Sequence, residues 1–545
     1  MASKLKVIDF FSGAGGFSEG FRQAGFDVIL AIDNWQIAVD THNENHPDGL
    51  AIKDDVIRIS NLPDNDFHKL IPDTEVIIGS PPCTDFSNSN KSGNGDKSKG
   101  IELVEAYLRI VARKKFKRRS KLKYWILENV PKIQNHIQES YSAKDLGLKG
   151  LWSLIVMSGN SGVYNAKYFG VPSNRKRYFC GEFPEPKRTI DDDSKLILLK
   201  DIIQALGAPK EKLHQKILDP IYNIKLAGED VSDHHYTQLL SDFEKKKAKR
   251  LKQDKGYMGK MSFPENPEKP ARTIMATMSF TSRECFVLGD DYSKLRAPTI
   301  REVASLMSFP IDYKFYGSSL GTKYRMIGNA VPPKMAIALA KGILNKERKN
   351  IILNGYQMIR HPQKLAFSNL NFNEIPIKEE KPKKVTARFK YHIPYFKFET
   401  YRVELTNHHS DFNNLNFKWT AEIHYNQGKE KAKKYTPSLD HIGFDKTDLR
   451  TADKLFTMSI RKKIVNPKEF QRFHCMTAEE VKQNQVLEPY AFLEQVREFL
   501  DKSFQFDRDH NHVLVAEAPG VLPTPIAIGY YILKRFTQLM ENTNE

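Results

Sequence analysis

The hydrophobic pattern of the first half of the chain alternates short apolar runs with helical periodicities. Short apolar runs are typical of buried strands, and an apolar residue every three or four positions is typical of an amphipathic helix. We expect strands at residues 5–9, 28–32, 76–78 and 124–127. We expect helices at residues 18–24, 36–43 and 102–114. Strands that alternate with helices predict an α/β fold, with helices on both faces of a mostly parallel sheet.

The pattern becomes less regular after residue 182. An acidic patch, Asp191–Asp193, and a run rich in Lys and Arg, Lys245–Lys255, lie in this part of the chain, which we interpret as a smaller domain. Helical patterns follow at 299–307 and at 333–344. The second of these comes after Pro332, and proline is tolerated in the first turn of a helix.

Residues 350–545 are numerous enough to form a domain of their own. Alternating apolar and polar positions predict strands within 383–405 and 417–425, and amphipathic patterns predict helices at 489–504 and 526–540. We therefore expect an extra α+β C-terminal domain. We assign no chemical motif to it.

The composition suits a polyanionic partner, although the charge alone fits a basic cytoplasmic protein without such a partner equally well. Lys and Arg number 84 against 66 Asp and Glu, which gives a formal net charge of +18. Nucleic acid is the commonest such partner of an enzyme. No stretch approaches the roughly 18 apolar residues of a membrane span, and no signal peptide is visible, so we expect a cytoplasmic protein with no membrane partner. The four cysteines form no Cys-x-x-Cys pair, so we expect no metal site and no disulfide framework.

A glycine-rich segment, residues 9–17 (Asp-Phe-Phe-Ser-Gly-Ala-Gly-Gly-Phe), joins the first expected strand to the first helix. Glycines allow a tight turn and let a ligand approach the helix N-terminus. Asp33 ends the second strand, 20 residues after Gly13, a spacing that suits binding of a ribose diol. These features predict a nucleotide-type cofactor and leave NAD, FAD and S-adenosylmethionine open. Ser18 stands where a complete G-x-G-x-x-G has its last glycine, which disfavours a dinucleotide.

Cys83 is the cysteine with unusual neighbours. Pro81 and Pro82 restrict the backbone before it, and residues 84–100 are rich in Ser, Asn, Gly and Lys. A polar, basic loop of this kind suits closure over a phosphate backbone. A lone cysteine is usually a buried structural residue. The two prolines at a strand end and the polar loop instead favour a nucleophile.

Two more polar motifs belong to later strands. Glu128 follows the strand 124–127, where a carboxyl group suits the Watson–Crick edge of cytosine, although a helix-capping role is the simpler interpretation. Arg175 and Arg177 are two positions apart, so their side chains lie on the same face of an expected strand. Two adjacent guanidinium groups suit a carboxylate, a phosphate or a base oxygen, and they are also common on a solvated basic face.

Taken in order, these segments resemble the motifs of DNA cytosine-5 methyltransferases. The matching segments are Asp9-Phe-Phe-Ser-Gly-Ala-Gly-Gly-Phe17, Gly79-Ser-Pro-Pro-Cys83, Glu128-Asn-Val130, Asn174-Arg-Lys-Arg177 and Gly328-Asn-Ala-Val-Pro-Pro333. The resemblance covers about residues 4–344. It implies a Rossmann-like class I methyltransferase domain at 1–182, completed by 323–348, and a small target-recognition region at 183–322. It also implies S-adenosyl-L-methionine as cofactor and cytosine in double-stranded DNA as substrate.

The resemblance implies a role for each matched residue. Cys83 would be the nucleophile that adds to cytosine C6 after base flipping, Glu128 the partner of cytosine N3, and Arg175 and Arg177 the arginines at the base. The implied cofactor residues are Asp33 for the ribose, Asp55 and Val56 for the adenine, Asn329 and Ala330 for the methionine moiety, and Phe11, Gly13, Ala14, Gly15, Gly16, Asn34 and Pro82 for the remainder of the site.

Three positions depart from the family pattern. Thr84 and Ser173 stand where the family usually has Gln, and Ser80 replaces a frequent Gly. They affect contacts to the DNA backbone rather than the chemistry. A tRNA cytosine-5 methyltransferase is the nearest alternative. A catalytically inactive nucleic-acid-binding protein is less consistent with intact Cys83 and Glu128, and a flavin or nicotinamide oxidoreductase leaves the Pro-Pro-Cys motif unexplained.

The resemblance also favours a bacterial or phage protein of a restriction–modification or phage-defence system. We expect residues 245–255 to contact DNA phosphates. We further expect residues 350–545 to contribute contacts to DNA or to other defence-system proteins.

Overall fold

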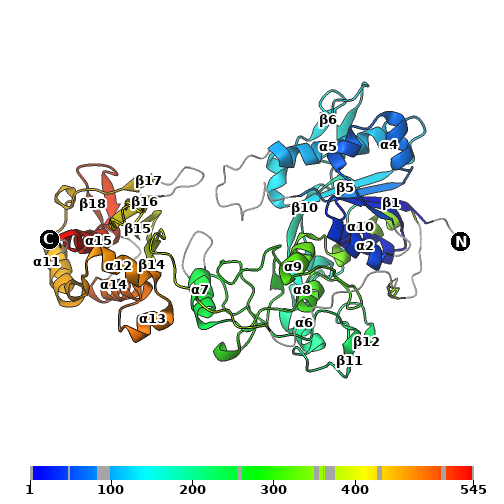
Figure 1. The fold of residues 1–545 in the computed structure, drawn as a ribbon. Coiled ribbons are helices and arrows are strands. Elements are labelled where there is room, and N and C mark those ends of the chain that lie inside the picture. Colours follow the sequence, from blue (N-terminus) through cyan, green and yellow to red (C-terminus); the bar gives the residue numbers. More distant parts are fainter. Residues whose placement is uncertain are drawn as a thin grey trace. The chain divides into compact units, whose positions relative to one another are not determined.

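The computed structural model describes residues 4–46, 50–82, 98–253, 260–348, 355–359, 361, 375–425, 433–504 and 511–542. The chain forms two compact units (Figure 1). The first unit comprises Met1–Leu240 and Pro264–Ile377, and the second comprises Ser241–Phe263 and Lys378–Glu545. The expected target-recognition region, 183–322, is thus divided between the units, because its residues 241–263 cluster with the C-terminal part of the chain.

A seven-stranded sheet in the order β3-β2-β1-β4-β5-β10-β8 forms the centre of the first unit. Its strands are β1 (Lys6–Phe10), β2 (Asp27–Asp33), β3 (Ala51–Lys53), β4 (Val76–Gly79), β5 (Tyr124–Asn129), β8 (Gly162–Asn165) and β10 (Lys176–Glu182). The pairs from β3 to β5 are parallel, and β10 runs antiparallel to both of its neighbours. The expected mostly parallel sheet is confirmed, as are the four strands predicted from apolar runs.

Helices cover both faces of this sheet because successive strand residues point in opposite directions. On one face, Ile8 and Phe10 pack with α3 (Val56–Ser60), α4 (Asp64–Leu70) and α5 (Ser98–Lys115). On the other face, Val7 packs with α1 (Gly16–Gln23) and α10 (Pro333–Lys346). Figure 1 shows α4 and α5 on the opposite side of β1 and β5 from α10. The helix α2 (Gln36–Asn45) follows β2.

The last helix of the first unit packs closely against its first helix. A Cβ atom at Gly20 of α1 would lie under 3.0 Å from Ala336 Cβ, Pro333 O and Ile337 N of α10. The two helices therefore approach each other through a position that holds only glycine. This contact brings the segment around residue 330 back to the N-terminal part of the sheet.

Residues between β10 and α10 form a second hydrophobic cluster in the first unit. Its elements are α6 (Leu199–Leu206), β11 (Lys216–Leu218), β12 (Lys225–Ala227), β13 (Ala271–Arg272), α8 (Ile300–Leu306) and α9 (Leu320–Asn329). The expected helix at 299–307 is confirmed by α8. Short strand β13 pairs with β9 (Ser173–Asn174), and a small ladder joins β6 (Ser140–Ser142) to β7 (Ser153–Ile155).

The second unit is an α+β domain with an antiparallel sheet in the order β14-β15-β16-β17. Its elements are α7 (Asp242–Gln253), β14 (Lys390–Phe398), β15 (Tyr401–Thr406), β16 (Thr420–Tyr425), β17 (Lys433–Tyr435), α11 (Lys446–Leu455), α12 (Pro467–Cys475), α13 (Ala478–Gln483), α14 (Pro489–Ser503), β18 (His512–Leu514), β19 (Val521–Pro523) and α15 (Thr524–Glu541). Val403, Leu405 and Ile423 pack with α15 in one core. The predicted C-terminal strands and helices are confirmed. Across the described parts of the chain, no helix is long and apolar enough to cross a membrane.

The close approach of α1 and α10 gives a stability test. We expect Gly20→Ala to destabilise the protein by about 1–3 kcal/mol, because the new methyl group collides with backbone and Cβ atoms of α10. Gly321→Ala in α9 is the matched control, because a Cβ atom there would meet only Ser319 Oγ, at 3.9 Å. This control should be neutral or stabilising by up to about 1 kcal/mol. Thermal unfolding measures both, and equal effects would contradict the packing described.

Candidate active site

The carboxyl ends of the parallel strands bring the sequence motifs together. The glycine-rich turn follows β1, Asp33 ends β2, β4 leads into Pro81 and Pro82, and Glu128 lies near the end of β5. The amide of Ser80 donates to Phe10 O (3.2 Å), which joins the ends of β1 and β4. Ligands of such folds bind at this edge. Cys83, which follows Pro82, lies outside the described residues.

Asp33 fixes the glycine-rich turn. Its Oδ2 accepts a hydrogen bond from the amide of Gly13 (2.9 Å), and its Oδ1 accepts one from the amide of Trp35 (2.8 Å). Burial raises the pKa of Asp33, while these amides and the nearby Arg325 oppose the rise. Each carboxylate oxygen keeps a second lone pair for a further donor. The 20-residue spacing noted in the sequence thus corresponds to a direct contact.

The turn itself has an open side. A Cβ atom at Gly13 would meet no heavy atom within 4 Å. The Ser12 hydroxyl is buried and has no hydrogen-bond partner among the residues that the structure describes. Phe11, half-buried, precedes it with a positive φ of 55°. A buried hydroxyl without a partner beside open space fits a bound polar ligand, because buried polar groups are otherwise almost always hydrogen-bonded.

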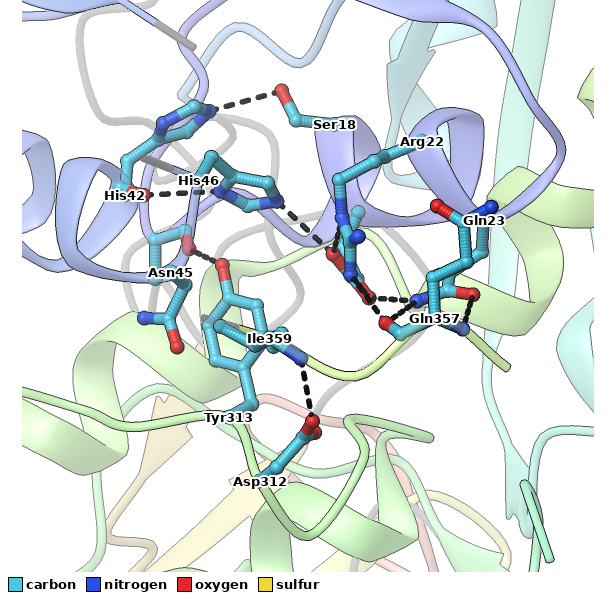
Figure 2. A network of polar contacts seen from close by, with 12 residues as sticks. Ser18, Arg22, Gln23, His42, Asn45, His46, Asp312, Tyr313, Gln357 and Ile359 are labelled. Carbon is cyan, nitrogen blue, oxygen red and sulfur yellow. Dashed lines mark hydrogen bonds and ion pairs between the residues drawn. The ribbon is translucent and has the colours of Figure 1, made fainter. Parts of the chain in front are cut away.

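The opposite side of the turn is tightly packed. Gly15 has a φ of 91°, and a Cβ atom on it would lie 2.7 Å from Tyr313 Oη, 2.8 Å from His42 Cδ2 and 2.8 Å from His46 Cε1. The Tyr313 hydroxyl donates to Ala14 O. Figure 2 shows Tyr313, His42 and His46 close to one another. Only glycine meets both demands, a left-handed conformation and an approach this close.

A chain of buried polar contacts extends from this packing. Ser18 Oγ donates to Asp9 Oδ2 (2.6 Å) and accepts from His42 Nε2 (3.1 Å). His46 faces two acceptors, His42 O at 3.0 Å from Nδ1 and Glu19 Oε2 at 3.1 Å from Nε2 (Figure 2). His46 thereby links the end of α2 to Glu19 of α1.

The acids in this chain of contacts carry opposite pKa shifts. Burial raises the pKa of Asp9 to about 7, against the effect of the Ser18 hydrogen bond. Burial also acts to raise the pKa of Glu19, but Arg22 and His46 outweigh it and lower the value to about 2. Burial, helped by the charge of His46, holds the pKa of His42 well below its usual value. The interior under the turn therefore holds one firmly ionised acid and one that titrates near neutral pH.

A segment after α10, residues 355–359, is bound to the same region. Gln357 O accepts from Arg22 Nη2 (3.2 Å) and Gln23 Nε2 (3.1 Å). Asp312 accepts from the Tyr356 hydroxyl (2.7 Å) and from the amide of Ile359 (2.9 Å). Figure 2 shows Gln357 beside Arg22 and Gln23 of α1, and Ile359 above Asp312. The chain on its way to the second unit is thus fastened to the helix that starts at the glycine-rich turn.

Glu128 and Arg177 form an ion pair at the other end of this edge. Arg177 Nε lies 3.1 Å from Glu128 Oε1, and the side chains are 15% and 7% exposed. Burial raises the pKa of Glu128, and the positive charges of Arg177 and Arg175 oppose the rise. A carboxyl group with a raised pKa keeps its proton more readily than an exposed one, which suits a general acid.

Arg175 and Arg177 have different surroundings, although the sequence suggested one shared face. Arg175 lies in the break between β9 and β10, and it is 1% exposed. Its guanidinium donates to the carbonyl oxygens of Ile274 (3.1 Å), Gly328 (2.9 Å) and Ala330 (3.1 Å). Arg175 therefore holds the segment that returns from the end of α9.

Asn129 is a residue of the site that the sequence reasoning missed. Its Nδ2 donates to Pro81 O (3.0 Å), and its Oδ1 accepts from the amide of Val130 (2.9 Å). The side chain thereby ties the end of β5 to the segment that leads to Cys83. The only signal in the sequence was an amide directly after Glu128.

The other expected cofactor residues lie around the same edge. Asp55 is exposed and caps α3 by accepting from the amides of Ile57 (2.7 Å) and Arg58 (3.2 Å). Val56 is buried in the core under that cap. The remaining positions are Ala14, buried; Gly16, buried beside Val331 O and Ala330; Ala330, half-buried; and Asn34, Pro82 and Asn329, exposed.

One polar cluster of the second unit has the residue types of a metal site. Glu404, Glu422 and His424 are buried, with His424 Nε2 at 2.7 Å from Glu404 Oε2 and 3.1 Å from Glu422 Oε2. Lys390 pairs with Glu404 (2.7 Å) and Lys434 with Glu422 (3.0 Å). The protein's own cations thus already offset both carboxylates, and we interpret the cluster as an ion-pair network.

A mostly parallel sheet with a glycine-rich turn after β1, an acid at the end of β2 and an ion pair between Glu128 and Arg177 defines the first unit as an α/β domain. The family model for C-5 cytosine-specific DNA methylases matches residues 5–345. The chain belongs to this family and is a DNA cytosine-5-methyltransferase. Residues 346–545 lie beyond the match.

The chain is also similar to individual proteins. Type II methyltransferase M1.HphI of Haemophilus parahaemolyticus is 30% identical over 360 residues, covering 62% of this chain and 87% of that protein. Type II methyltransferase M.MthTI of Methanothermobacter thermautotrophicus is 30% identical over 359 residues, covering 62% and 97%. Among solved structures, the S. pombe Dnmt2 methyltransferase matches 63% of this chain and 99% of its own, with 19% identity and a TM-score of 0.40.

Asp9 gives a pH test of the buried network. Its folded pKa of about 7 exceeds that of an exposed Asp, about 3.9, so folding favours the protonated form. The resulting stabilisation is complete below pH 4 or so and is lost as the pH rises through about 7. Asparagine stays neutral at every pH. We therefore expect the free energy of unfolding of Asp9→Asn, relative to that of the wild type, to rise by up to about 4 kcal/mol between pH 4 and pH 8.

Urea unfolding of the full chain at several pH values measures this difference. Asp27→Asn, at the exposed start of β2, is the matched control for the loss of one carboxyl group from the first unit. If the difference between Asp9→Asn and the wild type did not change with pH, the Asp9 carboxyl group would not titrate in this window.

Proposed function

We propose that the chain transfers the methyl group of S-adenosyl-L-methionine to C5 of a cytosine flipped out of double-stranded DNA, with Cys83 as nucleophile. The observation that carries the proposal is the buried Glu128–Arg177 pair at the end of β5, whose neighbour Asn129 holds the carbonyl of Pro81 two residues before Cys83. This one hydrogen bond thus connects the strand that carries Glu128 to the segment that leads to Cys83.

The cofactor would be held by residues whose polar groups can still form hydrogen bonds with a ligand. Asp33 would bind the ribose hydroxyls with its remaining lone pairs, and Ser12 and Gly13 would line the open side of the turn. Phe11, Asp55 and Val56 would contact the adenine, and the methionine moiety would lie toward Asn329 and Ala330. When bound, the cofactor supplies a methyl group on a positively charged sulfur.

The base requires activation because C5 of cytosine is a weak nucleophile. The Cys83 thiolate forms a bond to C6, and the electron pair of the C5–C6 double bond becomes available at C5. Glu128 donates a proton to N3, or shares one with it, and so offsets the charge that develops on the ring. After methylation, a water molecule takes the C5 proton, the C5–C6 double bond forms again as the C6–sulfur bond breaks, and the proton on N3 returns to Glu128. The thiolate leaves unchanged.

Two arginines would support this chemistry in different ways. Arg177 would contact the base beside Glu128, and its charge limits the rise of the Glu128 pKa. Arg175, which the sequence analysis grouped with the catalytic residues, is proposed instead as a positioning residue. Its hydrogen bonds to Gly328 and Ala330 place the returning segment next to Gly16.

We further propose that the enzyme modifies DNA within a restriction–modification or phage-defence system. The support is that several relatives bear the name type II methyltransferase. Binding of other defence-system proteins by the second unit stays a prediction.

We expect Cys83→Ser to abolish methyl transfer to duplex DNA, because the alkoxide needed for attack at C6 is far less accessible than a thiolate at neutral pH. Cys475→Ser in α12 is the matched control and should retain turnover, since a hydroxyl can still donate to Lys384 O. Transfer of a labelled methyl group measures both variants. Residual turnover of Cys83→Ser near the wild-type rate would remove Cys83 from this role.

We expect Glu128→Gln to lower kcat by about 10²–10⁴-fold, since the amide fills the same space but cannot supply a proton to N3. Glu182→Gln, at the end of β10 that is distant from Arg177, is an exposed control and should leave kcat unchanged. Steady-state kinetics at saturating DNA and cofactor distinguish the two. A kcat for Glu128→Gln within a few-fold of the wild type would exclude the acid role.

A further inference from the structure

The second unit contains a helix taken from the middle of the chain. The chain passes from the first unit to the second at residue 241, and α7 clusters with residues 378–545. Its buried side chains are Glu244, Lys245, Ala248 and Lys252, and this spacing marks one face of the helix. The helix is therefore an integral part of the second unit rather than a surface loop of the first.

This burial corrects the expectation that the whole Lys-rich run contacts DNA. Lys245 is 6% exposed and lies 3.3 Å from Asp242, and Lys252 is 0% exposed. Lys255 lies outside the described residues. The basic residues of α7 that are exposed or half-buried are Lys246, Lys247, Lys249 and Arg250.

A second basic segment, residues 378–384, runs along α12. Its main chain is anchored there, because the amide of Lys383 donates to Cys475 O (2.8 Å) and the Cys475 thiol donates to Lys384 O (3.3 Å). Gln471 Nε2 donates to Val385 O (2.7 Å), just beyond the segment. Its exposed cations are Lys378, Lys381, Lys383 and Lys384. The backbone hydrogen bonds to α12 fix the positions of Lys383 and Lys384 at the end of this segment.

The two segments place like charges next to each other. Burial lowers the pKa of Lys247, and the charges of Lys383, Arg250 and Lys378 lower it further. Two acids, Glu380 and Glu488, lie close enough to Lys383 to raise its pKa but do not outweigh its burial. The folded protein thus keeps cations from distant parts of the sequence together at an electrostatic cost, which an anionic ligand would relieve.

Arg250 is oriented by an aromatic ring. Its guanidinium carbon lies 4.4 Å from the centre of the Tyr490 ring at the start of α14. Contact with a ring face restrains the guanidinium plane and leaves N–H groups at its edge for other acceptors. A restrained guanidinium next to several ammonium groups suits phosphate oxygens.

We propose that the basic surface around Lys247, Arg250, Lys378 and Lys383 binds the phosphate backbone of duplex DNA. It would contact the substrate outside the active site and independently of sequence, because phosphates carry no base information. The inference uses the DNA substrate of the family but not the Cys83 chemistry. An acidic protein partner is less consistent with a surface made mainly of lysines, which are depleted in protein interfaces.

The test is DNA binding by the full chain, without added cofactor, as a function of salt. Removal of residues after 377 would strip α7 of the unit that covers its buried face, so point variants are preferable. We expect Lys247→Gln/Lys383→Gln to bind a duplex roughly tenfold or more weakly at 0.1 M salt. The slope of log K against log salt should be less steep by about 2, one unit for each lost phosphate contact.

The matched control is Lys446→Gln/Lys462→Gln, which removes two exposed charges elsewhere in the second unit. It should keep the wild-type affinity and slope. Thermal unfolding checks that both double variants keep the wild-type fold. A slope equal to those of wild type and control overturns the proposal, whichever other ligand the surface binds. Since binding is measured without turnover, failure of the Cys83 mechanism would leave this result unaffected.

Discussion

The turn at Gly15 is the constraint on which the site of the first unit depends. The residue has a left-handed backbone conformation, and three side chains lie within 2.8 Å of the place of a Cβ atom. Asp33 holds the other side of the turn through the amide of Gly13. With one side packed and one side open, the turn can present its free groups to a ligand in a fixed geometry, which avoids reorganisation when the ligand binds.

The packing under this turn consists largely of buried polar groups. Burying charged side chains costs several kcal/mol unless each has a partner, and Glu19 finds them in Arg22, Gln23 and His46. The segment 355–359 adds main-chain acceptors and donors to the same set. In return for this cost, the polar interior fixes the conformation of the glycine-rich turn, because the rings of His42 and His46 pack directly against Gly15.

Much of the fold could be predicted from the sequence, since strands and helices follow the apolar pattern and parallel strands bring their polar ends together. The site residues adjacent to strand ends, such as Asp33 and Glu128, could be found for that reason. Arg175 and Asn129 could not be assigned correctly, because their partners are main-chain carbonyls that no residue type reveals. The placement of α7 was also hidden, because its buried face includes Glu244 and Lys245 rather than an apolar stripe.

The central claim is that Cys83 bonds to cytosine C6 during methyl transfer. A duplex carrying 5-fluorocytosine tests it directly, since fluorine cannot leave C5 as a proton does and the bond to sulfur then persists. We expect mass spectrometry of the digested complex to find the DNA attached to Cys83, and only when S-adenosyl-L-methionine is present during the reaction. A methylated duplex without an adduct, or an adduct on Cys180, Cys285 or Cys475, would contradict the account.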